Sequence, residues 1–409
     1  MKKKVIVIGA GAAGLVAAGK AAESGKDVLL LEKNDRVGRK LLISGKGRCN
    51  ITNDTDIDGL IQNVPGNGNF LYSSFYTFSN MDLLELLHRE GLETKVERGG
   101  RVFPVSDKAQ DVVQILKRFA EKRGTEIRLN AYVDGIETKN SSVTGVRLKD
   151  GSILECSSVI LATGGASYPG TGSTGDGYKI AKKLGHTIVP LKPSLVPLVT
   201  AEKWIGELQG LSLKNISILI MDKKGRKIYD DFGEMLFTHF GVSGPVILSC
   251  SRHMLQYDYR NVKLVIDLKP ALDEETLDAR LQRDFEKFSR KQFKNSLDEL
   301  LPQKMIPVVI KLSQIPEDKP VNQITKNERR ELVMLLKNFT LEIAGSRPIA
   351  EAIVTAGGIC TGEINPSTME SKLVKGLFLA GEVIDVDGYT GGFNLTIAFS
   401  TGYTAGLNC

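Results

Sequence analysis

The first thirty-three residues restrict the possible folds of this chain more than any other stretch. Residues 5–8 form a short apolar run rich in β-branched side chains, which predicts a strand buried on both faces of a parallel sheet. Residues 9–14 fit the pattern G-x-G-x-x-G and lead into an alanine-rich stretch that favours a helix. A second apolar run, residues 27–31, ends at Glu32. This order of strand, glycine turn, helix and strand predicts a Rossmann-like dinucleotide-binding unit.

Each glycine of the pattern has a separate physical task. Gly9 makes the tight turn, Gly11 lets the backbone approach a pyrophosphate, and Gly14 lets the helix pack closely on the strand. The N-terminus of the helix offers unpaired N–H groups and the positive end of its dipole to the phosphates. Glu32 is placed to accept hydrogen bonds from an adenosine ribose, and its charge argues against a 2′-phosphate. The alternative is a glycine-rich turn that binds nothing.

The composition excludes several classes of protein. The 409 residues suffice for two or three domains, and 42% apolar and 25% charged residues are ordinary for a globular protein. No apolar run has the length of a membrane span, and the first strand leads into a nucleotide motif, which is not the layout of a signal peptide. We therefore expect a cytoplasmic protein without membrane contact. Five scattered cysteines and four dispersed histidines predict neither a disulfide framework nor a metal site.

The net charge of +6 would favour an anionic partner only if the excess were gathered on one face. The most highly charged segment, residues 273–345, has 13 basic and 13 acidic residues and therefore no net charge. We interpret this segment as a solvated helical surface, so binding to nucleic acid is not expected. The sequence does not predict an oligomeric state.

Three later stretches have the composition of backbone that lies close to a cofactor. Residues 36–53 form a polar loop with small residues, hydroxyl groups and five cations, which suits contact with a phosphate or a polar ring edge. An exposed basic loop is the alternative. One later apolar strand ends in Thr163-Gly164-Gly165, and another ends in Gly381-Glu382. A glycine-rich loop over residues 385–394 then leads into a helix.

The character of the sequence changes at Ser194, where a second domain is expected to begin. Prolines and alternating apolar runs predict an antiparallel β region over residues 194–272. Apolar residues at helical spacing then predict a small helical part over residues 273–345. The dinucleotide-binding domain would comprise residues 1–193 and 346–409.

These motifs together resemble a known group of flavoproteins. They are the G-x-G-x-x-G pattern with Glu32, the stretch Ser-Gly-Lys-Gly-Arg-Cys-Asn at 44–50, Ala162 to Gly165, Gly381-Glu382 with residues 391–394, and Thr-His-x-Gly-x-Ser-Gly-Pro at 238–245. Over nearly its whole length the chain is similar to the bacterial NAD(P)/FAD-dependent oxidoreductases, which are two-dinucleotide-binding-domain flavoproteins with an inserted domain. Members of this group carry names such as aminoacetone oxidase family FAD-binding enzyme and 3-dehydro-bile-acid reductase.

The resemblance implies FAD in the N-terminal site. It also implies an α/β fold in which a Rossmann-like FAD-binding domain carries a discontinuous insert made of a β-barrel-like part and a small helical part. The sequence has no second strand-turn-helix of the kind that holds NAD(P)H in disulfide-reductase flavoenzymes, so NAD(P)H, if it is the electron donor, would bind transiently or in a cleft of the insert. We predict that FAD is contacted by Gly9, Gly11, Ala12, Ala13, Gly14, Glu32, Lys33, Arg39, Lys40, Ser44, Gly45, Gly47, Arg48, Cys49, Asn50, Val133, Ala162, Thr163, Gly164, Gly165, Gly381, Glu382, Asp385, Gly391, Gly392, Phe393 and Asn394.

The predicted function is an FAD-dependent oxidoreductase that transfers hydride between bound flavin and a small organic substrate. The predicted catalytic residues are His239 as a proton donor, Arg101 and Tyr168. Arg101 could clamp a carboxylate or hold the domain interface, and His239 could instead be a structural residue of its loop. We interpret Cys49 as a packed side chain, because no second cysteine is near it in the sequence. Two alternatives stay open: a tRNA-modifying flavoprotein, and a flavin-binding carrier or sensor without its own substrate.

Overall fold

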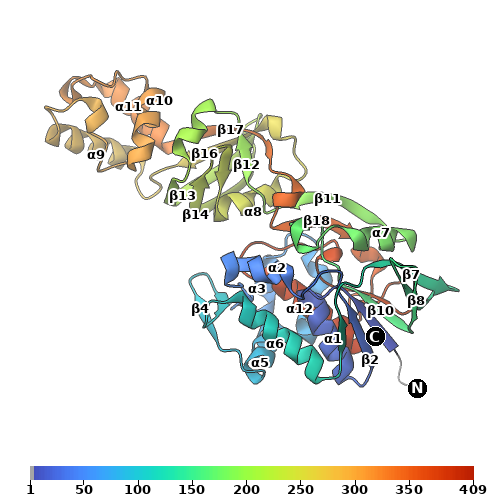
Figure 1. The fold of residues 1–409 in the computed structure, drawn as a ribbon. Helices are drawn as coiled ribbons and strands as arrows, with labels where there is room; N and C mark the ends of the chain where they lie inside the picture. The colour runs from blue at the N-terminus through green and yellow to red at the C-terminus, as the bar shows by residue number, and fades with distance from the viewer. Residues whose placement is uncertain (1–3) are drawn as a thin grey trace. The chain divides into compact units, whose positions relative to one another are not determined.

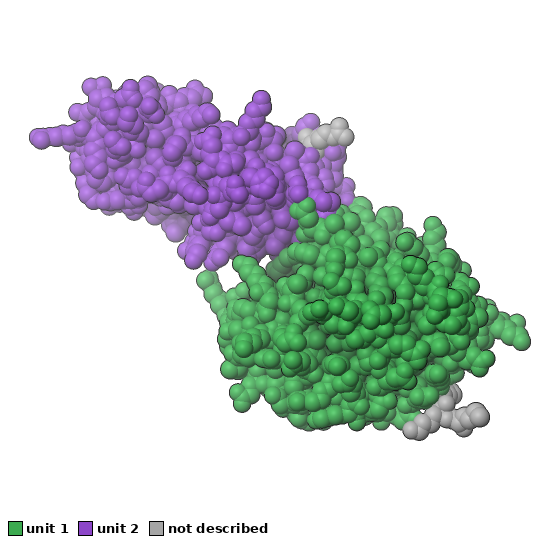
Figure 2. Space-filling view, viewed as in Figure 1, with its two compact units in different colours: residues 1–194, 349–409 green, residues 195–348 purple. Residues whose placement is uncertain are grey.

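The computed structural model describes residues 4–409, apart from the side chain of Arg260. The chain divides into two compact units, which Figure 2 distinguishes by colour. The first unit comprises Met1–Ser194 and Ile349–Cys409, and the second comprises Leu195–Pro348. The second unit is therefore an insertion in the first, because both ends of the chain belong to the first unit.

A five-stranded parallel sheet forms the centre of the first unit (Figure 1). Its order is β19-β10-β1-β2-β6, and every neighbouring pair is parallel. All four residues of β10 and the last four of β1 are buried, so these strands are covered on both faces as the apolar runs predicted. The Rossmann-like prediction is confirmed. The strands are β1 (Lys4–Ile8), β2 (Asp27–Leu31), β6 (Glu126–Arg128), β10 (Ser158–Leu161) and β19 (Leu377–Leu379).

The first and last helices of this unit pack directly against each other. A Cβ atom added at Gly402 would lie 2.4 Å from the carbonyl oxygen of Ala13, and one at Gly406 would lie 2.3 Å from that of Ala17. The two helix backbones approach so closely because these positions carry no side chain. The helices of the unit are α1 (Ala12–Glu23), α2 (Arg39–Ile43), α3 (Ile57–Gln62), α4 (Tyr72–Thr77), α5 (Asn80–Arg89), α6 (Ala109–Lys122), α7 (Asp176–Lys183) and α12 (Phe393–Asn408).

Three smaller antiparallel sheets complete the first unit. One has the order β3-β5-β4, the second has the order β7-β8-β9, and the third is the pair β11-β18. The pair β11-β18 contains the last residues before the insertion and some of the first after it. The strands are β3 (Thr52–Asn53), β4 (Thr94–Glu97), β5 (Arg101–Pro104), β7 (Val133–Lys139), β8 (Ser142–Leu148), β9 (Ile153–Glu155), β11 (Ile188–Ser194) and β18 (Val354–Ile359).

The second unit contains a closed antiparallel barrel of order β12-β15-β14-β13-β16-β17. Alternate residues of β16 and β17 are buried, as expected for strands with one face toward a core. The prediction of a barrel-like insert is confirmed. The strands are β12 (Leu198–Thr200), β13 (Ser212–Asp222), β14 (Lys227–Phe237), β15 (Gly241–Ser243), β16 (Val262–Asp267) and β17 (Phe339–Ser346), and α8 (Pro245–His253) packs on β14.

The helical part lies in the chain between two neighbouring strands of this barrel. It contains α9 (Glu274–Lys287), α10 (Ile306–Ser313) and α11 (Lys326–Lys337). The end of the range expected to be helical, residues 339–345, instead forms most of β17, which pairs with β16 and β12. The alternation of Phe339, Leu341 and Ile343 with exposed residues has the period of a strand, and the prediction overlooked it. Among residues 4–409, no helix combines the length and apolar character needed to cross a lipid bilayer.

Candidate cofactor site

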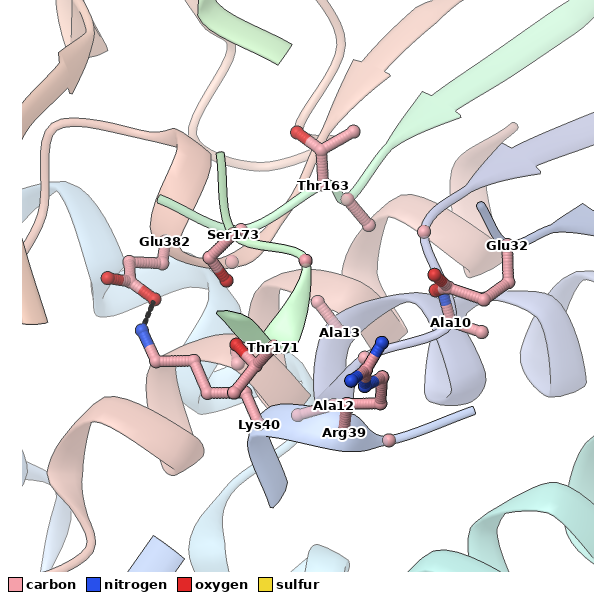
Figure 3. A pocket seen from close by; sticks show the side chains of 18 of the residues that line it. Ala10, Ala12, Ala13, Glu32, Arg39, Lys40, Thr163, Thr171, Ser173 and Glu382 are labelled. Carbon is pink, nitrogen blue, oxygen red and sulfur yellow. Dashed lines mark hydrogen bonds and ion pairs between the residues drawn. The ribbon is translucent and has the colours of Figure 1, made fainter. Parts of the chain in front are cut away.

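The carboxyl ends of β1, β2, β10 and β19 surround a cavity of about 240 Å³ in the first unit (Figure 3). Ligands of open α/β sheets bind at this edge. The structure brings 16 of the predicted cofactor residues together around it: Gly9, Gly11, Ala12, Ala13, Glu32, Lys33, Arg39, Lys40, Ser44, Val133, Ala162, Thr163, Gly164, Gly381, Glu382 and Asn394.

The three glycines of the first turn have different surroundings. Gly9 has a φ of +100°, and a Cβ there would lie 2.5 Å from the carbonyl oxygen of Ala162. A Cβ at Gly14 would lie 1.8 Å from the carbonyl oxygen of Gly9, so Gly14 packs behind the turn and lies outside the cavity. At Gly11 a Cβ would have no described atom within 4 Å. The fold requires glycine at positions 9 and 14, whereas at Gly11 the open space lets a ligand approach the protein backbone.

The N-terminus of α1 meets this open space. Gly11 is its N-cap residue, and no side chain of the described residues caps the helix there. Its first N–H groups and the positive end of its dipole are therefore available to an anion in the cavity. Ala12 and Ala13, the first helical residues, line the cavity. A pyrophosphate fits this arrangement without a competing side chain.

Glu32 is buried at the end of β2 and is held from two sides. Its Oε2 accepts a hydrogen bond from the backbone N–H of Ala10 at 2.8 Å. Its Oε1 accepts two from Asn34, at 2.9 Å from the backbone N–H and 2.6 Å from Nδ2. A carboxylate has about four acceptor positions, so Oε2 keeps one for a ribose hydroxyl. The acid therefore suits the adenosine end of a dinucleotide.

Two ion pairs lie in the wall of the cavity. Lys33 Nζ is 2.6 Å from Asp176 Oδ2 and 2.5 Å from Thr174 Oγ1. Lys40 Nζ is 2.6 Å from Glu382 Oε2, as the dashed line in Figure 3 marks. Burial would raise the pKa of Glu382, but the Lys40 ammonium and further hydrogen bonds outweigh burial and hold this pKa below its usual value. Both pairs join segments far apart in the sequence.

The N-terminus of α12 reaches the cavity through Asn394. Its Oδ1 accepts a hydrogen bond from the N–H of Gly388, and its Nδ2 donates to the carbonyl oxygens of Gly388 and Tyr389, which fixes the preceding loop. The predicted residues Gly391, Gly392 and Phe393 lie outside the cavity lining. Gly392 has a φ of +105°, and a Cβ there would lie 2.3 Å from backbone atoms of Thr52, so this glycine serves close packing.

The loop after α2 is placed differently from the prediction. Gly45, Gly47, Arg48, Cys49 and Asn50 lie outside the cavity lining, although Ser44 belongs to it. Arg48 forms ion pairs with Glu97 and Asp107, and its guanidinium lies 4.1 Å from the ring centre of Phe103. These acidic partners come from the β4-β5 hairpin region, and no sequence motif places that region beside the loop.

Cys49 is fully buried beneath the same loop. Burial raises the pKa of its thiol to about 11, so the thiolate form is scarce near neutral pH. This environment agrees with a packed side chain. Of the remaining predicted residues, Gly165 packs against Glu382, and Asp385 accepts a hydrogen bond from Asn67 at 3.0 Å; both lie outside the cavity lining.

The three predicted catalytic residues are not gathered at the cavity. Arg101 is exposed, and its Nε donates to the carbonyl oxygen of Arg98 at 3.0 Å. Tyr168 is exposed and has a left-handed backbone with a φ of 51°. Both lie in the first unit but outside the cavity lining. His239 belongs to the second unit, where its exposed ring contacts that of Phe240 edge-on at 5.0 Å.

Several cavity residues were missed by the sequence reasoning. Asn34 follows Glu32 by two positions, and Asp176 begins α7, where the sequence Thr-Gly-Asp is a readable helix start. Others, such as Ile353, are single apolar residues that belong to no motif. The missed residues that line the cavity with polar or aromatic groups include Asn34, Tyr132, Thr171, Ser173 and Asp176.

Solved structures with the same fold include a flavocytochrome and a ketosteroid dehydrogenase. The open conformation of a flavocytochrome c3 fumarate reductase matches with a TM-score of 0.53 and 17% identity, over 100% of this chain and 78% of that one. The 3-ketosteroid-delta4-(5alpha)-dehydrogenase from Rhodococcus jostii RHA1 matches with a TM-score of 0.52 and 16% identity, over 100% of this chain and 96% of that one. At these identities the likeness concerns the fold alone.

The Rossmann sheet with its glycine turn, Glu32 and inserted barrel defines an FAD-dependent oxidoreductase. Residues 3–408 match the family described as HI0933-like protein Rossmann domain, and the chain belongs to this family. It is 33% identical to the 3-dehydro-bile acid delta(4,6)-reductase of Clostridium scindens, over 98% of each chain. It is 32% identical to the ribosomal RNA dihydrouridine synthase of Escherichia coli, over 97% of this chain and 96% of the relative. The synthase of the same name from Haemophilus influenzae is 33% identical, over 98% of this chain and 97% of the relative.

Proposed function

We propose that the protein reduces a carbon–carbon double bond conjugated with a carbonyl group. The observation that carries this proposal is the chemistry common to its differently named relatives. A 3-dehydro bile acid with delta(4,6) unsaturation has double bonds conjugated with a ketone, and dihydrouridine forms when the double bond of uracil next to a carbonyl is saturated. Both are additions of hydride and a proton to the same kind of bond.

The cavity residues support this role by binding the cofactor. FAD, when bound, would supply the hydride. The glycine turn and the N-terminus of α1 would hold the pyrophosphate, and Glu32 would bind the adenosine ribose. The first N–H groups of α12 would stabilise negative charge that develops on the reduced cofactor, because they carry the positive end of the helix dipole.

The second hydrogen must arrive as a proton. Hydride adds to the carbon farther from the carbonyl group, and a general acid protonates the nearer carbon. We propose His239 as this acid, because its ring is exposed and a histidine imidazole is the side chain that most often transfers protons in enzymes. A His239→Gln variant should reduce its flavin at the normal rate but reduce substrate about a hundredfold more slowly. Equal loss in both half-reactions would contradict this role.

NADH or NADPH would reduce the flavin in a transient complex. The test is the absorbance spectrum of the FAD-loaded protein, followed anaerobically after NADH and then NADPH are added. We expect one of them to bleach the flavin band, and a 3-oxo-Δ4 steroid to restore it. Flavin that stays oxidised with both donors would contradict the proposal of an NAD(P)H-dependent reductase. Flavin that is reduced but not reoxidised by any unsaturated carbonyl compound would favour a carrier.

A second candidate substrate is a uridine of ribosomal RNA. It is favoured by the relatives of that name, whose identity of 32–33% and coverage of 96–98% are close to those of the bile acid reductase. The test incubates the reduced enzyme with ribosomal RNA that lacks dihydrouridine and measures this nucleoside by mass spectrometry. Dihydrouridine formation without activity on steroids would identify RNA as the substrate. Steroid reduction without dihydrouridine formation would identify the substrate as a small enone.

A further inference from the structure

Asn34 lies between two cavity residues and forms hydrogen bonds with both. Its backbone N–H and its Nδ2 donate to Glu32 Oε1 at 2.9 and 2.6 Å. Its Oδ1 accepts a hydrogen bond from Arg39 Nη1 at 2.9 Å. Asn34 itself lines the cavity. One side chain therefore fixes an acidic and a basic group at the same end of the site.

A side-chain amide can make both contacts at once. An amide carries a donor for the Glu32 carboxylate and an acceptor for the Arg39 guanidinium. Aspartate would keep the acceptor but would place a second negative charge against Glu32, and alanine would make neither bond. The choice of residue at this position thus follows from its two neighbours.

The surrounding backbone leaves the amide little freedom. The backbone N–H of Asn130 donates to the carbonyl oxygen of Asn34 at 3.0 Å, and Nδ2 also approaches the carbonyl oxygen of Thr171 at 3.4 Å. A Cβ added at Gly172 would lie 2.4 Å from Nδ2, so this glycine makes room for the amide. The amide is therefore preorganised before any ligand binds.

Arg39 differs from the two other cations of the cavity. Lys33 and Lys40 form ion pairs with Asp176 and Glu382. Within residues 4–409, no carboxylate is paired with Arg39, which bonds instead to the neutral amide of Asn34. Its positive charge is available to an anion. The N–H of Gly38, directly before Arg39, donates to the carbonyl oxygen of Ala10 at 2.8 Å, which fixes the start of α2 beside the glycine turn.

We propose that Asn34 is a positioning residue for the adenosine diphosphate half of FAD. It holds Glu32 toward the ribose and Arg39 toward the pyrophosphate that the glycine turn receives. Loss of its side chain removes one hydrogen bond from Glu32, which two backbone N–H groups still hold, and the bond that orients Arg39, so binding weakens without the removal of a charge. This inference concerns the cofactor and does not depend on which double bond the enzyme reduces.

The test measures the affinity of the apoprotein for FAD and for ADP. Asn34→Ala should weaken both by about tenfold, the effect of losing one hydrogen bond to a charged group. Asn34→Asp should weaken them further, because it repels Glu32. The matched control is Asn408→Ala at the far end of α12, where the amide donates to the carbonyl oxygen of Thr404 in its own helix and forms no other hydrogen bond with the described residues. The control should bind both ligands as the wild type does.

A double variant separates positioning from general structural damage. If Asn34 acts through Arg39, the combination with Arg39→Met should cost less affinity than the two single losses together. Additive losses would show that Asn34 does not position Arg39. Wild-type affinity of Asn34→Ala for ADP and FAD would overturn the proposal. A loss of FAD binding with ADP binding intact would also overturn it, because it would place Asn34 away from the adenosine half.

Discussion

Replacing Gly11 with alanine should separate the needs of the fold from those of the cofactor. Gly11 has φ −85° and ψ −163°, which alanine adopts without strain, and a Cβ there would meet no described atom within 4 Å. As an N-cap, alanine costs about 0.5–1 kcal/mol relative to better capping residues, while its restriction of the unfolded chain returns about 0.4–1 kcal/mol. The two terms nearly cancel, so the apoprotein should keep its stability within about 1 kcal/mol, or about 2–4 °C in Tm.

The same methyl group should weaken FAD binding strongly. It occupies the space through which the pyrophosphate approaches the backbone, and one hydrogen bond to a charged group contributes about 1.5–3 kcal/mol. The Kd for FAD, measured by fluorescence titration of the apoprotein, should therefore rise at least about tenfold. Gly14→Ala should behave in the opposite way and destabilise the apoprotein by about 3 kcal/mol, because its Cβ would lie 1.8 Å from a carbonyl oxygen.

Gly345→Ala is the matched control for this experiment. Gly345, in β17 of the second unit, also has open space at the Cβ position, so its variant should change neither Tm nor the Kd for FAD by much. Wild-type FAD affinity of Gly11→Ala would refute the assignment of this space to the cofactor. A large loss of apoprotein stability would refute the claim that the fold does not need this glycine.

Three further predictions concern charged groups and a thiol. Lys40→Met should lower the free energy of unfolding in urea by about 1–3 kcal/mol. This is less than the 3–5 kcal/mol of a fully buried pair, because the side chains of Lys40 and Glu382 are 29% and 17% exposed. Adding Glu382→Gln should restore part of the loss, and no restoration would contradict the pairing. Burial lowers the pKa of His186 below 6.5, although the Glu363 carboxylate opposes this shift. The contribution of His186 to the free energy of unfolding is therefore fully present above pH 6.5 and falls as the pH drops below it. The slope of the free energy of unfolding against pH should lessen in His186→Gln, and an unchanged slope would exclude His186 as its source. Cys49→Ala should leave steady-state turnover within about twofold, since the buried thiol, with a pKa of about 11, takes no part in it; a tenfold loss at unchanged Tm would contradict this.

The first strand, glycine turn and helix could be predicted because their information is local. Residues 5–23 contain the apolar strand, the turn residues and the helix preference in one continuous stretch, and the contacts that matter join near neighbours. The barrel was predicted in kind, but its closing strand was not, because β17 follows a helical segment and its partners β16 and β12 lie far back in the chain. Strand pairing across such separations leaves little trace in a single sequence.

The cavity walls show the same limit. Arg48 was predicted to contact the cofactor because it follows Ser44 closely, yet it forms ion pairs with Glu97 and Asp107 instead. Lys33, predicted to contact the cofactor, lines the cavity, but its partner Asp176 is 143 positions away and no pattern links the two. Charged side chains on loops form ion pairs with groups that the folded chain brings near them. Their contacts therefore follow from the complete fold rather than from the motif.

The position of the insertion also sets an order for the making of this protein. Its cofactor cavity is walled in part by Ala380, Gly381, Glu382, Asn394 and Leu395, which lie among the last thirty residues of the 409. A ribosome has therefore already released the whole inserted barrel and its helices before it delivers the strand and helix that finish the sheet. FAD can meet a complete binding site only after these late segments have been synthesised.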